Sequence, residues 1–152
     1  MLAELVHNQI LIISLCTWAI TQITKVLIIL VQEKRIAWNF LLSSGGMPSA
    51  HTATVCALAT TIALTLGVGS AYFGIAVVFA VIVIYDAAGI RQSVGQHSVV
   101  LNRIVKEFSF KKGKSAIEQE LREFIGHTPF QVLIGGLLGV FTAWLWVFIS
   151  RT

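Results

Sequence analysis

The chain has 152 residues, of which 56% are hydrophobic and only 12% are charged, and its formal net charge is +4. Soluble domains carry about a quarter charged residues, so this composition excludes a soluble domain and indicates one membrane domain, 1–152. The two cysteines lie inside apolar runs, which excludes a disulfide scaffold. In a membrane chain, an excess of Lys and Arg marks the cytoplasmic side and anionic lipid rather than nucleic acid.

Four apolar runs resemble membrane-spanning helices, at about 9–31, 49–66, 71–88 and 130–149. A helix needs about 20 residues to cross a hydrocarbon core about 30 Å thick. The second run is short for this purpose, and the other three are comfortable. We therefore expect an all-α integral membrane bundle of about four transmembrane helices.

A long polar segment separates the third and fourth apolar runs. Between 89 and 129 it carries seven Lys and Arg against four Glu. Apolar residues recur there at helical spacing, which predicts amphipathic helices along the membrane at about 98–110 and 115–126. Ser115 and Glu118 have the spacing of a capping box at the start of the second helix.

The distribution of basic residues predicts the orientation of the bundle. Nine of the eleven Lys and Arg fall in the connections after the first and third spans. With four spans these two connections lie on one side, which the positive-inside rule makes cytoplasmic. Both termini are then expected on the opposite side.

This topology brings together the polar residues that hydrophobicity does not explain. They lie at the cytoplasmic ends of the spans: Lys25 on the first, Gly45, Gly46, Ser49 and His51 leading into the second, Asp86 and Arg91 after the third, and His127 before the fourth. Four spans therefore present cations, a carboxylate and two histidines to one candidate site.

The loop before the second span has features of a phosphate cradle. Gly45 and Gly46 allow the backbone to approach a ligand, and Ser49 is placed to cap a helix whose free N–H groups attract anions. An ordinary capped loop is the alternative. Lys25 within an apolar span indicates function, because a charge at that depth is costly, and snorkelling to the interface is its alternative.

The histidines suit proton exchange or attack on phosphorus near neutral pH. His51 and His127 precede or begin neighbouring helices, whereas His97 lies in the basic segment, where a solvated side chain is the simpler interpretation. Asp86 is placed to orient a histidine or to pair with Arg91. No HxxxH or CxxC spacing is present, so we expect no metal.

These residues also carry a family resemblance. The chain resembles the divergent branch of the type-2 phosphatidic acid phosphatase and vanadium haloperoxidase superfamily, which has small members in bacteria and plastids. The motifs are Gly-Gly-Met-Pro-Ser-x-His, Asp-Ala-x-Gly-x-Arg and Gly-His-x-Pro. They appear here at 45–51, 86–91 and 126–129, in that order along the chain.

The resemblance implies hydrolysis of a phosphomonoester through a phosphohistidine, without metal or another cofactor. It implies that His51 is the general acid, that His127 is the nucleophile and that Lys25 and Arg91 hold the phosphoryl oxygens. The wider superfamily has Ser-Arg, five residues, His, three residues and Asp. Arg91 and His97 keep the inner spacing, so His97 is the alternative nucleophile. Three positions depart from the wider pattern: Ile90 replaces Ser, Leu101 replaces Asp, and Gln32 stands where an Arg would follow Lys25.

We therefore expect a membrane lipid phosphatase in a bacterial cytoplasmic or plastid membrane, with its site facing the cytoplasm. The expected substrates are phosphatidylglycerol phosphate, phosphatidic acid or a polyprenyl phosphate, and the expected partners are this lipid, the surrounding membrane lipids and a possible second copy of the chain. One alternative is a non-catalytic carrier or binding protein for phosphate or anionic lipid. Another is a helical partner in a larger complex, which Gly135 and Gly139 would suit as a packing face.

Overall fold

The structure is a computed structural model that describes residues 5, 7–34, 46–90, 97, 99–101 and 128–151. Within these residues the regular elements are all helical, as the sequence predicts. They are α2 (Gln9–Glu33), α3 (Ala50–Leu66), α4 (Ala71–Tyr85), the π-helical segment η2 (Asp86–Ile90) and α7 (Pro129–Arg151). The predicted interfacial helices at 98–110 and 115–126 lie outside the described residues, apart from 99–101, which are helical.

Short polar side chains begin three of these helices. The side chains of Asn8, Ser49 and Ser70 each accept a hydrogen bond from the backbone N–H three residues on, which satisfies one free donor at the start of α2, α3 and α4. Gly67 ends α3 with a φ of 87°, a conformation that glycine adopts without steric cost. The turn that follows reverses the chain into α4.

Three of the four long helices have the length and composition of a membrane span. The candidate spans are Gln9–Gln32, Ala71–Gly89 and Pro129–Arg151, whereas Ala50–Leu66 is a shorter apolar helix. At about 1.5 Å per residue, the 17 residues of α3 cover roughly 26 Å, which is less than a full hydrocarbon core. The predicted count of four spans is therefore not confirmed, although all four helices pack in one bundle.

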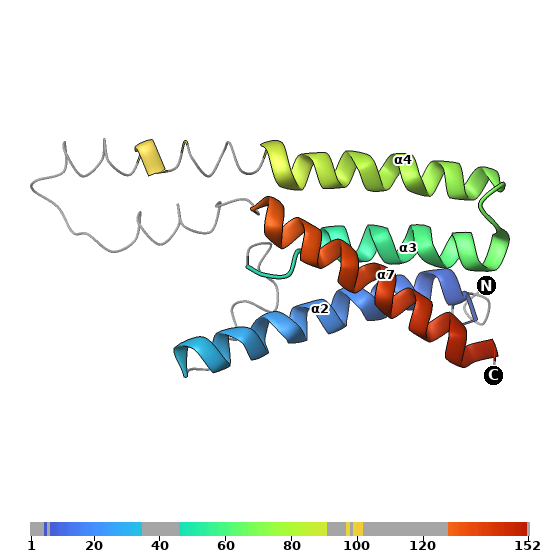
Figure 1. Cartoon of the computed structure of the whole chain (residues 1–152), viewed down its shortest axis with the longest axis horizontal. Coiled ribbons are helices and arrows are strands. Elements are labelled where there is room, and N and C mark those ends of the chain that lie inside the picture. The colour runs from blue at the N-terminus through green and yellow to red at the C-terminus, as the bar shows by residue number, and fades with distance from the viewer. Residues whose placement is uncertain are drawn as a thin grey trace, which may run out of the picture.

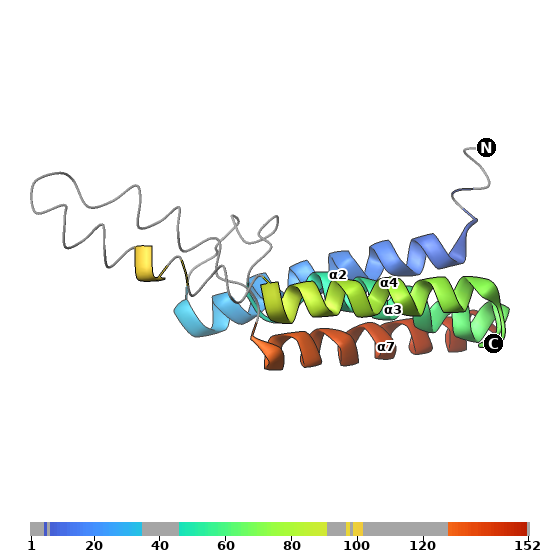
Figure 2. The same ribbon diagram turned by 90° about the horizontal axis from the view of Figure 1, so that it is seen from above.

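The central helix of the bundle is α3, which packs against α7, α2 and α4. Figures 1 and 2 show that α3 and α7 begin at the end of the bundle where α2 and α4 finish. The last turns of α2, residues 46–51, η2 and residues 128–131 form this end, which we call the motif end. The start of α2, the turn between α3 and α4, and the end of α7 lie at the other end, which we call the terminal end.

Two glycines allow α3 and α7 to approach closely. A Cβ atom added to Gly135 would lie 2.5 Å from the carbonyl oxygen of Ser49, and one added to Gly139 would collide with the backbone of Ala53. Gly135 and Gly139 lie one helical turn apart, as do Ser49 and Ala53, so the two backbones meet along matching faces. This glycine face therefore packs within the bundle.

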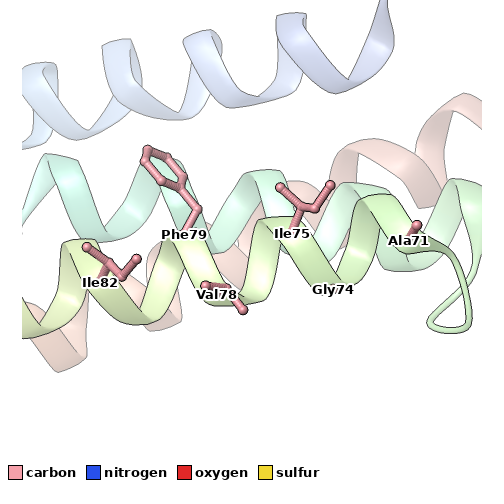
Figure 3. Close-up of a pocket in the computed structure, with 6 residues that line it drawn as sticks. All are labelled: Ala71, Gly74, Ile75, Val78, Phe79 and Ile82. Carbon is pink, nitrogen blue, oxygen red and sulfur yellow. The ribbon is translucent and has the colours of Figure 1, made fainter.

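The helix α4 is apolar on its outer face. Its buried residues are the small Ala76 and Ala80, while the large side chains point outward. A shallow groove of about 510 Å³ runs along α4. Figure 3 shows the residues that line it, among them Ile75, Val78, Phe79 and Ile82. Such a surface suits contact with lipid chains.

Candidate functional site

A line of polar side chains runs along α2 and faces the bundle. Ser14, Thr17, Thr21 and Lys25 follow at helical spacing, and each is at most 6% exposed. The Ser14 hydroxyl donates to the carbonyl of Ile10 over 2.7 Å, and the Thr21 hydroxyl to that of Thr17 over 2.7 Å. Each of these hydroxyl groups donates its hydrogen bond to a backbone carbonyl of its own helix. Such bonds allow hydroxyl groups to lie in apolar surroundings.

Lys25 is the most deeply buried charged side chain of the described residues, with 1% exposure. An ammonium group that merely reaches for the membrane surface would remain exposed to solvent. The Lys25 side chain is instead buried within the bundle, and its role stays a prediction.

The depth of Lys25 follows from a contact between α2 and α7. The hydroxyl oxygens of Thr17 and Thr142 lie 3.0 Å apart, which fixes the two helices relative to each other. Lys25 lies eight residues from Thr17 towards the motif end, or about 12 Å. Ser49 packs at Gly135, seven residues from Thr142 towards the same end, or about 10 Å. Lys25 and the start of α3 therefore lie at similar depth.

Ser49 caps α3 and also joins it to α7. Its backbone N–H donates to the carbonyl of Gln131 over 3.2 Å. Its hydroxyl oxygen accepts from the N–H of Thr52 over 3.4 Å and from the Thr52 hydroxyl over 3.1 Å. Ser49 is fully buried. The sequence predicts this capping role, and its role towards phosphate stays a prediction.

The glycine loop before α3 is described in part. Gly46 has a φ of 86°, which favours glycine at this position, and it is half-buried. Pro48, which follows a cis peptide bond after Met47, is buried against the start of the helix. Gly45 lies outside the described residues. The loop thus turns tightly at the helix start, as a backbone that approaches a ligand must do.

His51 lies in the first turn of α3 with an exposed side chain. Because α3 and α7 both begin at the motif end, the positive ends of two helix dipoles lie there. The exposed imidazole lies beside these helix starts. The other predicted histidine of this pair, His127, lies outside the described residues.

Asp86 marks a change in helix type. It follows the last residue of α4, and its backbone N–H bonds to the carbonyls of both Ile82 and Val83. From Asp86 the chain continues as the π-helical segment η2, which packs against α7. The Asp86 side chain is half-buried. π-Helical turns occur frequently at functional sites. Arg91 lies beyond the described residues.

The start of α7 contains a reciprocal capping box that the sequence analysis missed. The N–H of Thr128 donates to Oε1 of Gln131 over 3.1 Å, and the N–H of Gln131 donates to the Thr128 hydroxyl over 3.3 Å. Pro129 occupies the first helical position, which it favours. The spacing Thr-x-x-Gln in the sequence is typical of a capping box and could have predicted this one. Part of the Gly-His-Thr-Pro motif thus serves to begin a helix at a fixed place.

Sequence reasoning also missed Gln22, one turn before Lys25. Gln22 is 5% exposed, and within the part of the chain that the structure describes its Oε1 atom accepts no hydrogen bond. A buried acceptor without a donor costs about 1–3 kcal/mol. A polar residue three positions before a buried lysine in an apolar run was the available signal.

The remaining candidate, His97, is exposed in a helical position. Among the described residues, no three His, Cys, Asp or Glu side chains gather as a metal site would require. The expectation that the protein uses no metal stays a prediction, as do the chemical roles of the candidate residues. What the structure brings to the motif end is Lys25, Gly46, Ser49, His51 and Asp86.

Comparison with known proteins gives a family match and one relative. The sequence pattern of the Divergent PAP2 family matches residues 6–142. The chain is also similar to the uncharacterized membrane protein YuiD of Bacillus subtilis (strain 168), with 36% identity over 146 residues, which cover 90% of this chain and 92% of that relative. No solved structure matches the chain.

Proposed function

This chain belongs to the divergent PAP2 family, and we propose that it is a membrane phosphatase that hydrolyses a phosphomonoester on a lipid headgroup. The observation that carries the proposal is the buried Lys25, which lies at the depth of the α3 helix start. A phosphate between this cation and the helix N-terminus would be attracted from both sides.

The proposed mechanism proceeds through a phosphohistidine. A ring nitrogen of His127 attacks phosphorus, the bond to the lipid oxygen breaks, and His51 gives that oxygen a proton. Water then attacks the phosphohistidine, His51 takes a proton from the water, and phosphate leaves with both histidines restored. Lys25, Arg91 and the backbone at Gly45, Gly46 and Ser49 hold the phosphoryl oxygens, and Asp86 orients a histidine. Such placement and charge stabilisation supply most of the catalysis in phosphoryl transfer.

A lipid substrate is favoured over a water-soluble one by the surroundings of the site. Lys25 is shielded from solvent inside a bundle whose outer surfaces are apolar. A lipid can bring its phosphate to the helix ends at the motif end while its chains stay in the bilayer. Phosphatidylglycerol phosphate, phosphatidic acid and polyprenyl phosphate all meet this condition.

The proposed location is a bacterial cytoplasmic or plastid membrane, with the motif end at the cytoplasmic face because most Lys and Arg lie in its connections. Single cysteines introduced at Lys112 and Thr152, in a background without Cys16 and Cys56, would test this orientation. An impermeant thiol reagent applied from outside is expected to label position 152 alone. Labelling of position 112 would reverse the orientation.

A non-catalytic carrier of phosphate or anionic lipid is the second candidate. It is favoured by the residue types at the motif end, because a buried ammonium group, a glycine turn and the start of a helix can hold an anion without reacting. The paired histidines distinguish the two functions, because a carrier does not need them.

Phosphate release from a panel of lipid phosphates, in detergent with EDTA present, would test the proposed function. We expect the wild-type protein to release phosphate, vanadate to inhibit it by mimicking pentacoordinate phosphorus, and His51→Ala to lose most activity. His7→Ala is the matched control, since His7 is an exposed histidine at the terminal end. Binding without release would favour the carrier, and activity that EDTA abolishes and a divalent ion restores would reject the metal-free mechanism.

A further inference from the structure

Gln22 differs from the other buried polar side chains of α2. The hydroxyls of Ser14 and Thr21 donate to carbonyl oxygens of their own helix. The carbonyl oxygen of Gln22 can only accept, and the N–H groups within a helix are already occupied by helix bonds. Its donor must be a side chain or a ligand, and in the described part of the chain no donor reaches it.

The position of Gln22 relates this acceptor to the phosphate-binding cation. Gln22 and Lys25 are three residues apart on one helix, a spacing at which Cβ atoms lie about 5–6 Å apart. Both side chains are buried, with exposures of 5% and 1%. One small polar ligand can therefore meet both, with an anionic group on Lys25 and a hydrogen-bond donor on Gln22.

We propose that Gln22 recognises the lipid headgroup: its Oε1 accepts a hydrogen bond from a free hydroxyl group close to the phosphate. The site would then select lipid phosphomonoesters whose headgroup carries such a hydroxyl. This inference rests on the proposed function, because it takes the ligand at Lys25 to be a lipid phosphate.

The donor is a hydroxyl group rather than an ammonium group for an electrostatic reason. A positively charged headgroup nitrogen at Gln22 would lie within one helical turn of the Lys25 cation, and like charges repel strongly away from water. A neutral hydroxyl donates the same hydrogen bond without this repulsion. A bound water molecule could also donate, but it would give the site no preference between headgroups.

Binding of two matched lipids would test the inference. The probes are dioleoyl phosphatidylglycerol phosphate and its analogue with a propanediol headgroup, which lacks only the headgroup hydroxyl. Binding is followed by native mass spectrometry in detergent. Every protein in this comparison also carries His127→Ala so that the lipid is not consumed, and wild type here refers to position 22. We expect the hydroxylated lipid to bind about tenfold more tightly or better, because a site built for a hydroxyl rejects the analogue without it.

The variants separate recognition from packing. Gln22→Met keeps the length of the side chain and removes the acceptor, so we expect it to bind the two lipids equally, at the affinity that the wild type has for the analogue. Gln32→Met is the matched control, an exposed glutamine on the same helix, and should keep the wild-type preference. The melting temperature of Gln22→Met should equal or exceed that of the wild type, because an unpartnered buried acceptor is lost. A lower melting temperature would give Gln22 a structural role and overturn the inference.

The outcomes for the two proposals are distinct. Equal binding of both lipids by the wild type, or binding of neither, overturns headgroup recognition by Gln22, whatever phosphate release shows. A preference that depends on Gln22, together with no phosphate release by the protein that keeps His127, supports the recognition and rejects the phosphatase.

Discussion

The two ends of the bundle use polar residues differently. At the terminal end, Asn8 and Ser70 cap helices, and the Arg151 side chain donates to the carbonyl of Leu64, so these groups complete the backbone. At the motif end, Lys25 is buried and Gln22 has an acceptor without a donor among the described residues. Helix caps occur at both ends, with Ser49 and Thr128 at the motif end, so the difference between the ends is the buried Lys25 and the acceptor of Gln22.

The largest expected effect is the loss of activity when a histidine of the motifs is replaced, compared with replacement of His7 at the terminal end. His127→Ala should abolish turnover on every substrate, because the expected nucleophile is lost. His51→Ala should lose about 100-fold or more on a lipid alcohol and much less on p-nitrophenyl phosphate, whose leaving oxygen needs little protonation. Steady-state rates on the two substrates measure this, with His7→Ala as the control.

A misfolded His51→Ala protein would lose both activities together, so the ratio of the two rates reports the role of His51. Equal losses on both substrates would reject His51 as the general acid. A fully active His127→Ala would make His97 the candidate nucleophile.

Removal of a cation is the next comparison. Lys25→Met keeps the buried length of the side chain and removes the charge that holds the phosphate, so we expect phosphate release to fall about 100-fold. Arg151→Met removes a cation at the terminal end and should leave the rate close to that of the wild type. Rates of phosphate release under saturating lipid measure both. If the two substitutions lowered the rate of phosphate release equally, the proposed role of Lys25 in holding the phosphate would be wrong.

Two glycine substitutions compare the close contact between α3 and α7 with the apolar outer face of α4. Gly139→Ala places a methyl group against the backbone of Ala53 and should destabilise the protein by about 1–3 kcal/mol. Gly74→Ala meets open space on α4 and should be neutral or stabilising by up to about 1 kcal/mol. Thermal unfolding in detergent measures both. If Gly139→Ala were as stable as the wild type, the close approach of α3 and α7 would be wrong.

The smallest effect compares two serine caps. Ser49→Ala and Ser70→Ala each remove a hydroxyl that accepts from the third N–H of a helix, so each should cost about 1 kcal/mol of stability. Ser49→Ala alone should also slow phosphate release, because only Ser49 lies at the motif end. Melting temperatures and rates for both variants measure this. Equal rates in the two variants would limit Ser49 to capping.

Much of the helical architecture is predictable because long apolar runs and caps are local features. The run at 9–31 corresponds to α2, and Ser49 caps a helix as its position suggests. The number of spans was harder to predict, since the 17 residues of α3 are near the limit of a span. No residue pattern predicted the π-helical turn at Asp86. This segment contacts α7, and such packing between distant parts of the chain is not visible in the local sequence.

The site was predictable only where a residue is unusual for its surroundings. Lys25 stands out as a charge in an apolar run, and Gly46 as part of a glycine pair before a helix. Gln22 was missed because its importance depends on burial and on a missing donor, which only the packing of the bundle determines. Thr128 was missed because its motif was interpreted as chemistry alone.

The most direct test of the central claim is to trap the phosphorylated enzyme. Lipid phosphate with a radioactive phosphoryl group would be mixed with the protein and the reaction stopped in base, where phosphohistidine survives, before the labelled residue is identified. We predict label on His127 in the wild type and none in His127→Ala. Turnover without phosphohistidine, or label on His97, would contradict the account.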